Sequence, residues 1–206
     1  MNSSALARRH VVVTRPAGQS ARLSALIRAA GGEPLLYPAL EILDAADVQP
    51  VLELIGRLDA FDLAIFVSAN AVDKALALVR ARRDWPPRLR VATVGRGSER
   101  ELQRCGFSAV IAPAARFDSE GLLDLPELKQ VEGKRVVIFR GAGGRELLGA
   151  TLAARGAAVE YAECYRRGRP QADPAPLLAL RARRALDAFT VTSSEGLANL
   201  HAMLGE

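Results

Sequence analysis

Short runs of β-branched and other apolar residues alternate with helical patterns along the whole chain, and five of these runs end in a turn of small polar residues or glycine. The five runs are HVVVT, DLAIFVS, RVATVG, RVVIFR and LDAFTVT. A strand that is followed each time by a helix predicts parallel sheets with helices on both faces, because parallel neighbours need a crossover connection. We therefore expect an α/β fold with doubly wound parallel sheets.

Each of the five turns leads from a strand into the start of a helix, where free backbone N–H groups and the helix dipole favour negative charge. One such turn is ordinary α/β architecture. Five of them, in a chain poor in catalytic side chains, predict a ligand with many negative charges that is held largely through backbone groups. The turns are Thr14-Arg15-Pro16, Ser68-Ala69-Asn70, Gly95-Arg96-Gly97-Ser98, Gly141-Ala142-Gly143-Gly144 and Ser193-Ser194.

The 206 residues carry a net charge of +5, but the positions of the basic residues argue against a nucleic-acid partner. The two arginine clusters, at 80–83 and 181–184, fall at expected helix ends, where cations complement the dipole and meet water. Nucleic-acid binding would favour basic residues interleaved with aromatic ones. We interpret the excess of arginine over lysine mainly as a bias of composition.

Neither a membrane segment nor a metal site is predicted. No apolar run is long enough to cross a bilayer, and the first residues lack the apolar stretch of a signal peptide. Cys105 and Cys164 have no metal-binding spacing, and His10 and His201 lie away from the turns. We expect a cytoplasmic protein that acts as a monomer, with reduced cysteines.

Two extended stretches mark candidate domain junctions. After Tyr37-Pro38 the chain stays extended through residues 40–42, and residues 164–167 continue a strand before Gly168 and Pro170. The two stretches can pair as a bridge between domains. The prediction is an inserted α/β domain of residues 38–167 and a discontinuous terminal domain of residues 1–37 and 168–206.

The predicted terminal domain contains few strands. It has three, near His10, Glu33 and Leu186, whereas sheets of this kind usually hold about five or six. We therefore expect that a closing portion of this domain is missing after residue 206. A chain of this length is accordingly expected to be weakly active or inactive.

Common nucleotide and nucleophile motifs are incomplete. The third glycine of a dinucleotide fingerprint is replaced by Arg100 after Gly95-Arg96-Gly97 and by Glu146 after Gly141-Ala142-Gly143. Gly133-Lys134 lacks the Ser or Thr of a Walker A loop, and no G-x-S-x-G elbow is present. Neither a cofactor nor paired catalytic carboxylates are indicated, so chemistry would rely on positioning and electrostatics.

An ordered set of motifs resembles uroporphyrinogen-III synthases over the whole chain. Each motif alone is weak, and their order makes the set specific. The motifs are V-T-R-P-A-G-Q-S, L-x-x-x-G-G-E-P, Y-P-A-L-E-I, F-V-S-A-N-A-V, V-A-T-V-G-R-G-S-E-R-E-L, S-E-G-L-L, V-V-I-F-R-G-A-G-G-R-E-L-L, R-G-A-A-V-E-Y-A-E-C-Y-R-R and V-T-S-S-E-G-L-A-N-L.

The resemblance implies two doubly wound, flavodoxin-like domains joined by a two-stranded linker, with the active site in the cleft between them. It implies a cofactor-free reaction on hydroxymethylbilane, a linear tetrapyrrole with eight carboxylates. Loss of the terminal hydroxyl gives an azafulvene, and closure through a spiro intermediate inverts the last ring and yields uroporphyrinogen III. Members of the family normally continue beyond the S-S-E-x-L-x-N-L helix.

The resemblance also assigns candidate site residues. Tyr165 matches a tyrosine beside the cleft and is a candidate for assisting loss of the hydroxyl. The candidate substrate-binding residues are Thr14, Arg15, Ser68, Ala69, Asn70, Gly95, Ser98, Ser193 and Ser194. Simpler interpretations remain open: Thr14, Ser68 and Ser193 can be helix caps only, and Tyr165 can simply pack in the linker. Arg140 and Arg145 can bind propionates or be solvated.

Two other functions remain open from the residues. The first is a non-enzymatic two-domain protein that binds an anionic small molecule. The second is a nucleotide-binding enzyme that uses the turn at Gly141–Gly144.

Overall fold

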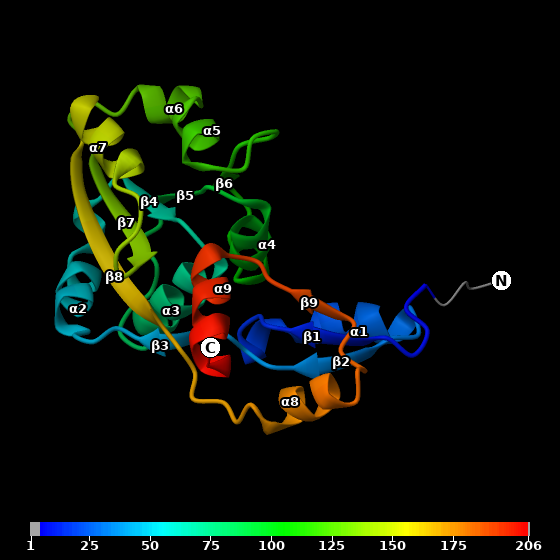
Figure 1. The fold of residues 1–206 in the computed structure, drawn as a ribbon. Helices are drawn as coiled ribbons and strands as arrows, with labels where there is room; N and C mark the ends of the chain where they lie inside the picture. The colour runs from blue at the N-terminus through cyan, green and yellow to red at the C-terminus, as the bar shows by residue number, and fades with distance from the viewer. Residues whose placement is uncertain (1–4, 206) are drawn as a thin grey trace. The chain divides into compact units, whose positions relative to one another are not determined.

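The computed structural model describes residues 5–205, and the chain divides into two compact units. Unit 1 comprises Met1–Ile42 and Arg167–Glu206, and unit 2 comprises Leu43–Arg166. Residues 1–4 and 206, which the predicted terminal domain includes, lie outside the described residues. Each unit is built around its own sheet (Figure 1).

Unit 1 contains a three-stranded sheet in the order β2-β1-β9, and both strand pairs are parallel. The strands are β1 (His10–Val13), β2 (Glu33–Leu36) and β9 (Ala188–Thr190). A short 3-10 helix η1 (Ala17–Gln19) precedes α1 (Ala21–Ala29), and the later helices are α8 (Ala175–Ala182) and α9 (Ser194–Leu204). These are the three strands that the sequence predicts.

Helices cover both faces of this small sheet because the side chains of β1 alternate in direction. Val11 and Val13 form a buried cluster with Ile27 of α1. Val12 belongs to a second cluster with Leu177 of α8 and Leu200 of α9. The valine run of β1 is therefore buried on both faces, as expected for a central parallel strand.

Unit 2 contains a six-stranded sheet in the order β3-β8-β7-β4-β5-β6. The strands are β3 (Glu41–Asp44), β4 (Leu63–Phe66), β5 (Arg90–Thr93), β6 (Val110–Ile111), β7 (Arg135–Gly141) and β8 (Ala158–Gly168). The helical segments are α2 (Gln49–Gly56), η2 (Leu58–Ala60), α3 (Ala69–Arg80), α4 (Arg96–Arg104), α5 (Ser119–Leu123), α6 (Pro126–Lys129) and α7 (Leu147–Ala154). The strands from β8 through β7, β4 and β5 to β6 are parallel to their neighbours.

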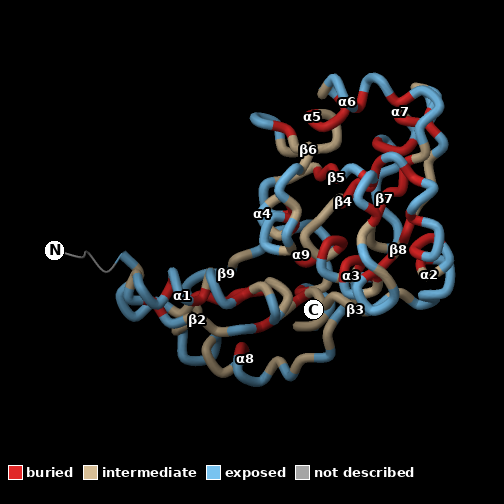
Figure 2. Tube along the Cα trace, turned by 180° about the vertical axis from the view of Figure 1, so that it is seen from behind, coloured by how far each residue is buried: buried red, intermediate tan, exposed pale blue. Residues whose placement is uncertain are grey.

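The core of unit 2 also lies on both faces of its sheet. Ile65 and Ile138 pack with leucines of α5, α6 and α7. Phe66 and Phe139 point to the other face, where their rings stack at 4.9 Å between centroids. Buried residues accordingly concentrate along β4, β7 and α3 (Figure 2). This is the doubly wound arrangement that the alternation of strands and helices predicts.

β3 and β8 are neighbours in the sheet, and both extend across the division between the units. They contain the two extended stretches that the sequence analysis predicts as a paired linker. β8 is 11 residues long, and its register against β7 shifts between Arg140 and Gly141. The chain thus passes between the units on two adjacent strands.

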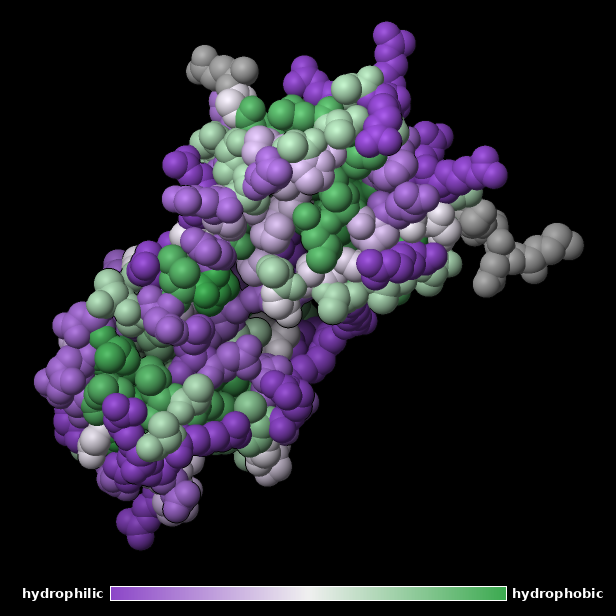
Figure 3. Space-filling model, turned by 90° about the horizontal axis from the view of Figure 1, so that it is seen from below, coloured by the Kyte–Doolittle hydropathy of each residue, from purple (hydrophilic) through white to green (hydrophobic). Residues whose placement is uncertain are grey.

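Hydrophobic residues are scattered over one face of the molecule. From below, apolar residues form separate patches among hydrophilic ones (Figure 3). Within residues 5–205, helices are either too short or too polar to span a bilayer.

Candidate functional site

Three of the predicted turns lie together in unit 2. β4 pairs with β5 and with β7, so that Phe66 lies opposite both Thr93 and Phe139. The turns after these strands therefore emerge side by side at the carboxyl edge of the sheet, which is the usual ligand-binding edge of an open parallel sheet. This edge carries Ser68, Gly95 and the glycine turn after β7.

Ser68 is the N-cap of α3. Its backbone is extended, with φ −160°, and its Oγ accepts a hydrogen bond from the N–H of Ala71 at 3.0 Å. Ala69 and Asn70 are the first two residues of this 12-residue helix. The first N–H groups of a helix have no acceptor within the helix, and helix starts of this kind favour anions in proteins.

Tyr165 lies against this turn and is almost completely buried, with 1% of its surface exposed. Its Oη is 3.1 Å from Ser68 Oγ. The ring fills the space beside Gly141, where an added Cβ would stand 2.7 Å from the ring carbon Cζ. Ser68, Gly141 and Tyr165 thus form one packed cluster at the carboxyl edge.

The turn at Gly95 opens α4. Gly95 is the N-cap, and the helix begins at Arg96, two residues before the predicted start at Ser98. Ser98 consequently lies inside the first turn of the helix, where it is 5% exposed. Ser98 is therefore buried, whereas Gly95 is partly exposed.

The glycine turn after β7 already holds carboxylates of its own chain. Gly143 N–H donates to Glu163 Oε1 at 3.3 Å. Arg140 pairs with Glu163 at 3.0 Å and with Glu146 at 2.9 Å, and its guanidinium lies 4.1 Å from the ring centroid of Tyr161. Glu163 was not identified from the sequence, because a strand pattern does not show which carboxylate of β8 reaches the turn.

These contacts bear on two of the sequence interpretations. Arg140 is neither solvated nor a free propionate ligand, since its charge is matched by two carboxylates. A phosphate at Gly143 would meet the negative charge of Glu163. The nucleotide-binding alternative therefore loses its strongest motif. Arg145 has no hydrogen bond or ion pair with another described residue.

The remaining predicted residues lie in unit 1, also at the carboxyl edge of its sheet. Thr14 is buried, and its Oγ1 donates to the carbonyl oxygen of Thr190 at 2.6 Å, which ties the end of β1 to the end of β9. Thr14 is therefore not a helix cap. Ser193 is the N-cap of α9, accepting from Gly196 N–H at 3.0 Å, and Ser194 is the first residue of that helix.

Arg15 follows the buried Thr14 and is partly exposed. It makes no hydrogen bond or ion pair with another residue in the range 5–205. Within the same range, no group of three or more His, Cys, Asp or Glu residues is placed to hold a metal ion.

The sequence matches the uroporphyrinogen-III synthase HemD profile over residues 21–206. It is 36% identical over 191 residues to the uroporphyrinogen-III synthase of Salmonella typhimurium, covering 92% of this chain and 78% of the relative. The chain belongs to the uroporphyrinogen-III synthase family. The uroporphyrinogen-III synthase of Escherichia coli is 33% identical over 195 residues, covering 94% of this chain and 79% of that protein.

Solved uroporphyrinogen-III synthases share the fold. A mutant uroporphyrinogen III synthase from Thermus thermophilus aligns with 95% of this chain and 77% of its own, at a TM-score of 0.63 and 20% sequence identity. The wild-type structure from the same organism covers 93% of this chain and 75% of its own, with a TM-score of 0.53 at 21% identity. The predicted two-domain α/β fold with parallel sheets is thereby confirmed.

Proposed function

We propose that this chain acts as a uroporphyrinogen-III synthase, a cyclising lyase that converts hydroxymethylbilane to uroporphyrinogen III in tetrapyrrole biosynthesis. Membership of the family carries this proposal. The non-enzymatic alternative is not favoured, because the curated relatives named above are described as synthases.

We propose that helix starts at the carboxyl edge of each sheet hold carboxylates of the substrate. Three helices begin at these edges: α3 after Ser68, α9 after Ser193 and α4 after Gly95. Each of the three N-cap residues has an extended backbone. Each helix start offers N–H donors that are directed away from the strands, together with the positive end of a helix dipole. Thr14 and Arg15 belong to the same edge as Ser193 and Ser194.

The enzyme mainly has to steer closure, since the competing head-to-tail closure to isomer I occurs without catalysis. About 3 kcal/mol of preferential stabilisation gives more than a hundredfold preference for one product. A few donors aimed at the substrate carboxylates can supply this amount. The reaction therefore needs no metal or cofactor in this proposal.

We propose that Tyr165 assists departure of the hydroxyl as a proton donor. Ser68 Oγ already accepts the Ala71 N–H, so its own proton is available to Tyr165 Oη. That arrangement leaves the Tyr165 proton free for the leaving oxygen. Because Tyr165 is buried, the substrate reaches it only after neighbouring groups move.

The deciding assay supplies freshly generated hydroxymethylbilane, oxidises the products and separates isomers I and III. The proposal expects isomer III in an amount above that found with heat-denatured protein, which gives isomer I. Isomer I alone, from protein with native circular dichroism, would refute the proposal. Tight tetrapyrrole binding with no isomer III would instead support the binding-protein alternative.

We also propose the cytoplasm as the place of action and a monomer as the working form. Cys105 and Cys164 are both free thiols, which suits a reducing compartment. Light scattering at several protein concentrations tests the monomer, and a mass of two chains would contradict it.

A further inference from the structure

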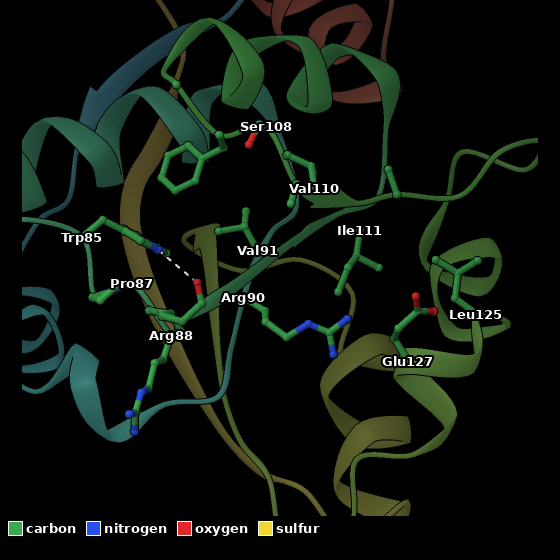
Figure 4. A pocket seen from close by; sticks show the side chains of 15 residues that line it. Trp85, Pro87, Arg88, Arg90, Val91, Ser108, Val110, Ile111, Leu125 and Glu127 are labelled. Carbon is green, nitrogen blue, oxygen red and sulfur yellow. Dashed lines mark hydrogen bonds between the residues drawn. The ribbon is translucent and has the colours of Figure 1, made fainter.

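A hollow of about 580 Å³ opens at the amino ends of β5 and β6 (Figure 4). Arg90 and Val110, the first residues of these two strands, line it. Because the strands run parallel, this end of the sheet is opposite to the edge that carries Ser68 and Gly95. The hollow is therefore separate from the candidate substrate site, and none of the predicted site residues lines it.

One wall of the hollow is aromatic and held in place. Trp85 Nε1–H donates to the carbonyl oxygen of Leu89 at 3.1 Å. The Trp85 ring meets Phe107 edge to face, with centroids 5.1 Å apart and planes at 85°. Such a fixed apolar surface suits a flat ligand, since little side-chain freedom is lost on binding.

Two arginines without partners lie beside this wall. Arg88 and Arg90 line the hollow and an adjoining one of about 260 Å³. Neither makes an ion pair or side-chain hydrogen bond with another described residue, whereas the nearby Arg83 pairs with Asp59. In Figure 4 the Arg88 side chain points away from the hollow and the Arg90 side chain extends across it, so the unpaired guanidinium of Arg90 is the group that favours an acidic ligand.

Glu127 limits how much negative charge the hollow accepts. Figure 4 shows the Arg90 side chain extending across the hollow toward the side that carries Glu127. No ion pair joins them in the part of the chain that the structure describes. The carboxylate repels a second acidic group and can accept a hydrogen bond from a ligand donor.

We propose that this hollow binds a small, flat, apolar molecule that carries one acidic group, with the ring against Trp85 and the acid at Arg90. Its volume falls within the range of small-molecule sites, about 300–1,000 Å³. The proposal does not depend on the cyclisation reaction, because the hollow shares no residue with that site.

Trp85 makes the test direct, because it is the only tryptophan of the chain. The probe is anilinonaphthalene sulfonate (ANS), whose fluorescence is excited by energy transfer from Trp85 when it binds nearby. The uncharged phenylnaphthylamine has the same rings without the acid. The whole protein is titrated without hydroxymethylbilane. We expect energy transfer from Trp85 to ANS that saturates as ANS is added. Phenylnaphthylamine should bind about tenfold more weakly than ANS.

Three single variants distinguish binding of ANS in the hollow from binding to positive charge elsewhere on the surface. Arg90→Gln is expected to weaken ANS binding by about tenfold, and Glu127→Gln to strengthen it by about twofold or more. Arg82→Gln removes another exposed arginine that has no ion pair with a described residue, and it should leave ANS binding unchanged. Circular dichroism checks that each variant is folded.

The proposal is overturned if Arg90→Gln and Arg82→Gln behave alike. It is also overturned if both probes bind equally, or if bound ANS receives no energy from Trp85. The last outcome would place ANS at another surface of the protein.

Discussion

The ring of Tyr165 lies against the backbone of Gly141, so that a methyl group on Gly141 would stand 2.7 Å from ring carbon Cζ. The register of β7 against β8 shifts at this point. The shift lets Tyr165 oppose Gly141 and brings its hydroxyl to Ser68. The missing side chain of Gly141 therefore determines where Tyr165 sits.

Gly141→Ala should displace Tyr165 and destabilise the protein by about 1–3 kcal/mol, as expected for added volume in a packed site. The fraction of isomer III should fall as well. Denaturant unfolding and the isomer assay measure the two effects. Gly56→Ala is the matched control, because nothing lies within 4 Å of a Cβ at that helical position. Equal stability of the two variants would contradict the packing argument.

The hydrogen bond between Ser68 and Tyr165 predicts coupled effects. Ser68→Ala should cost about 1–2 kcal/mol, because it removes both the helix cap and the partner of Tyr165. Tyr165→Phe should reduce the yield of isomer III with a smaller loss of stability. The double variant should lose less stability than the sum of the two single variants, as measured by denaturant unfolding.

Ser68→Gly separates the cap from the hydroxyl, since glycine is tolerated as an N-cap with a loss of only a few tenths of a kcal/mol. We expect this variant to keep most of the stability and still lose isomer III. Wild-type product ratios in Ser68→Gly would argue against a role of the hydroxyl in the reaction.

Glu160 links stability to pH. Hydrogen bonds from Arg57, at 2.8 Å, and from Arg135, at 3.2 Å, together with the charges of both, hold the pKa of its carboxyl below the ordinary value. This stabilisation is complete above the unfolded pKa of about 4.3, and it is lost as pH falls through the folded pKa.

Glu160→Gln should therefore lower the free energy of unfolding by about 1 kcal/mol or less at neutral pH, because the pair is partly exposed. The difference from the wild type should shrink as the solution is acidified through the folded pKa. Urea unfolding at several pH values measures it. Glu132→Gln, at an exposed position with no ion pair to a described residue, should show no such trend.

The two cysteines should differ sharply in reactivity. Burial raises the pKa of the Cys164 thiol to about 12, and its Sγ lies 3.3 Å from the carbonyl oxygen of Arg140. Cys105 is partly exposed. Iodoacetamide at mildly alkaline pH should modify Cys105 and spare Cys164, as read by mass spectrometry, while both react in concentrated urea. Equal rates in the native protein would contradict the buried position of Cys164.

Much of the fold was predictable because its signals are local in the sequence. Each strand contains a run of apolar residues, and each helix begins at a residue that favours turns. Ser68 and Ser193 were recognisable as caps for this reason. Contacts between distant segments were not predictable. The bond from Thr14 to Thr190 joins residues 176 positions apart, and no local pattern marks it.

The candidate site shows the same limit. Gly141 looked like a turn glycine, but its lack of a side chain serves the ring of Tyr165 on the next strand. Glu163 of the neighbouring strand β8 accepts a hydrogen bond from the glycine turn, at Gly143. The short helix α6, Pro126–Lys129, was not predicted, because so short a segment cannot show a helical period.

The pairing of β1 with β9 has a consequence for biosynthesis. β1 leaves the ribosome long before β9, because all of unit 2 is translated between these two neighbouring strands. The valines of β1 must therefore stay uncovered on one side while Leu43–Arg166 emerges. Nascent chains of this protein should consequently depend on chaperones for this strand, while unit 2 can already collapse around its own sheet.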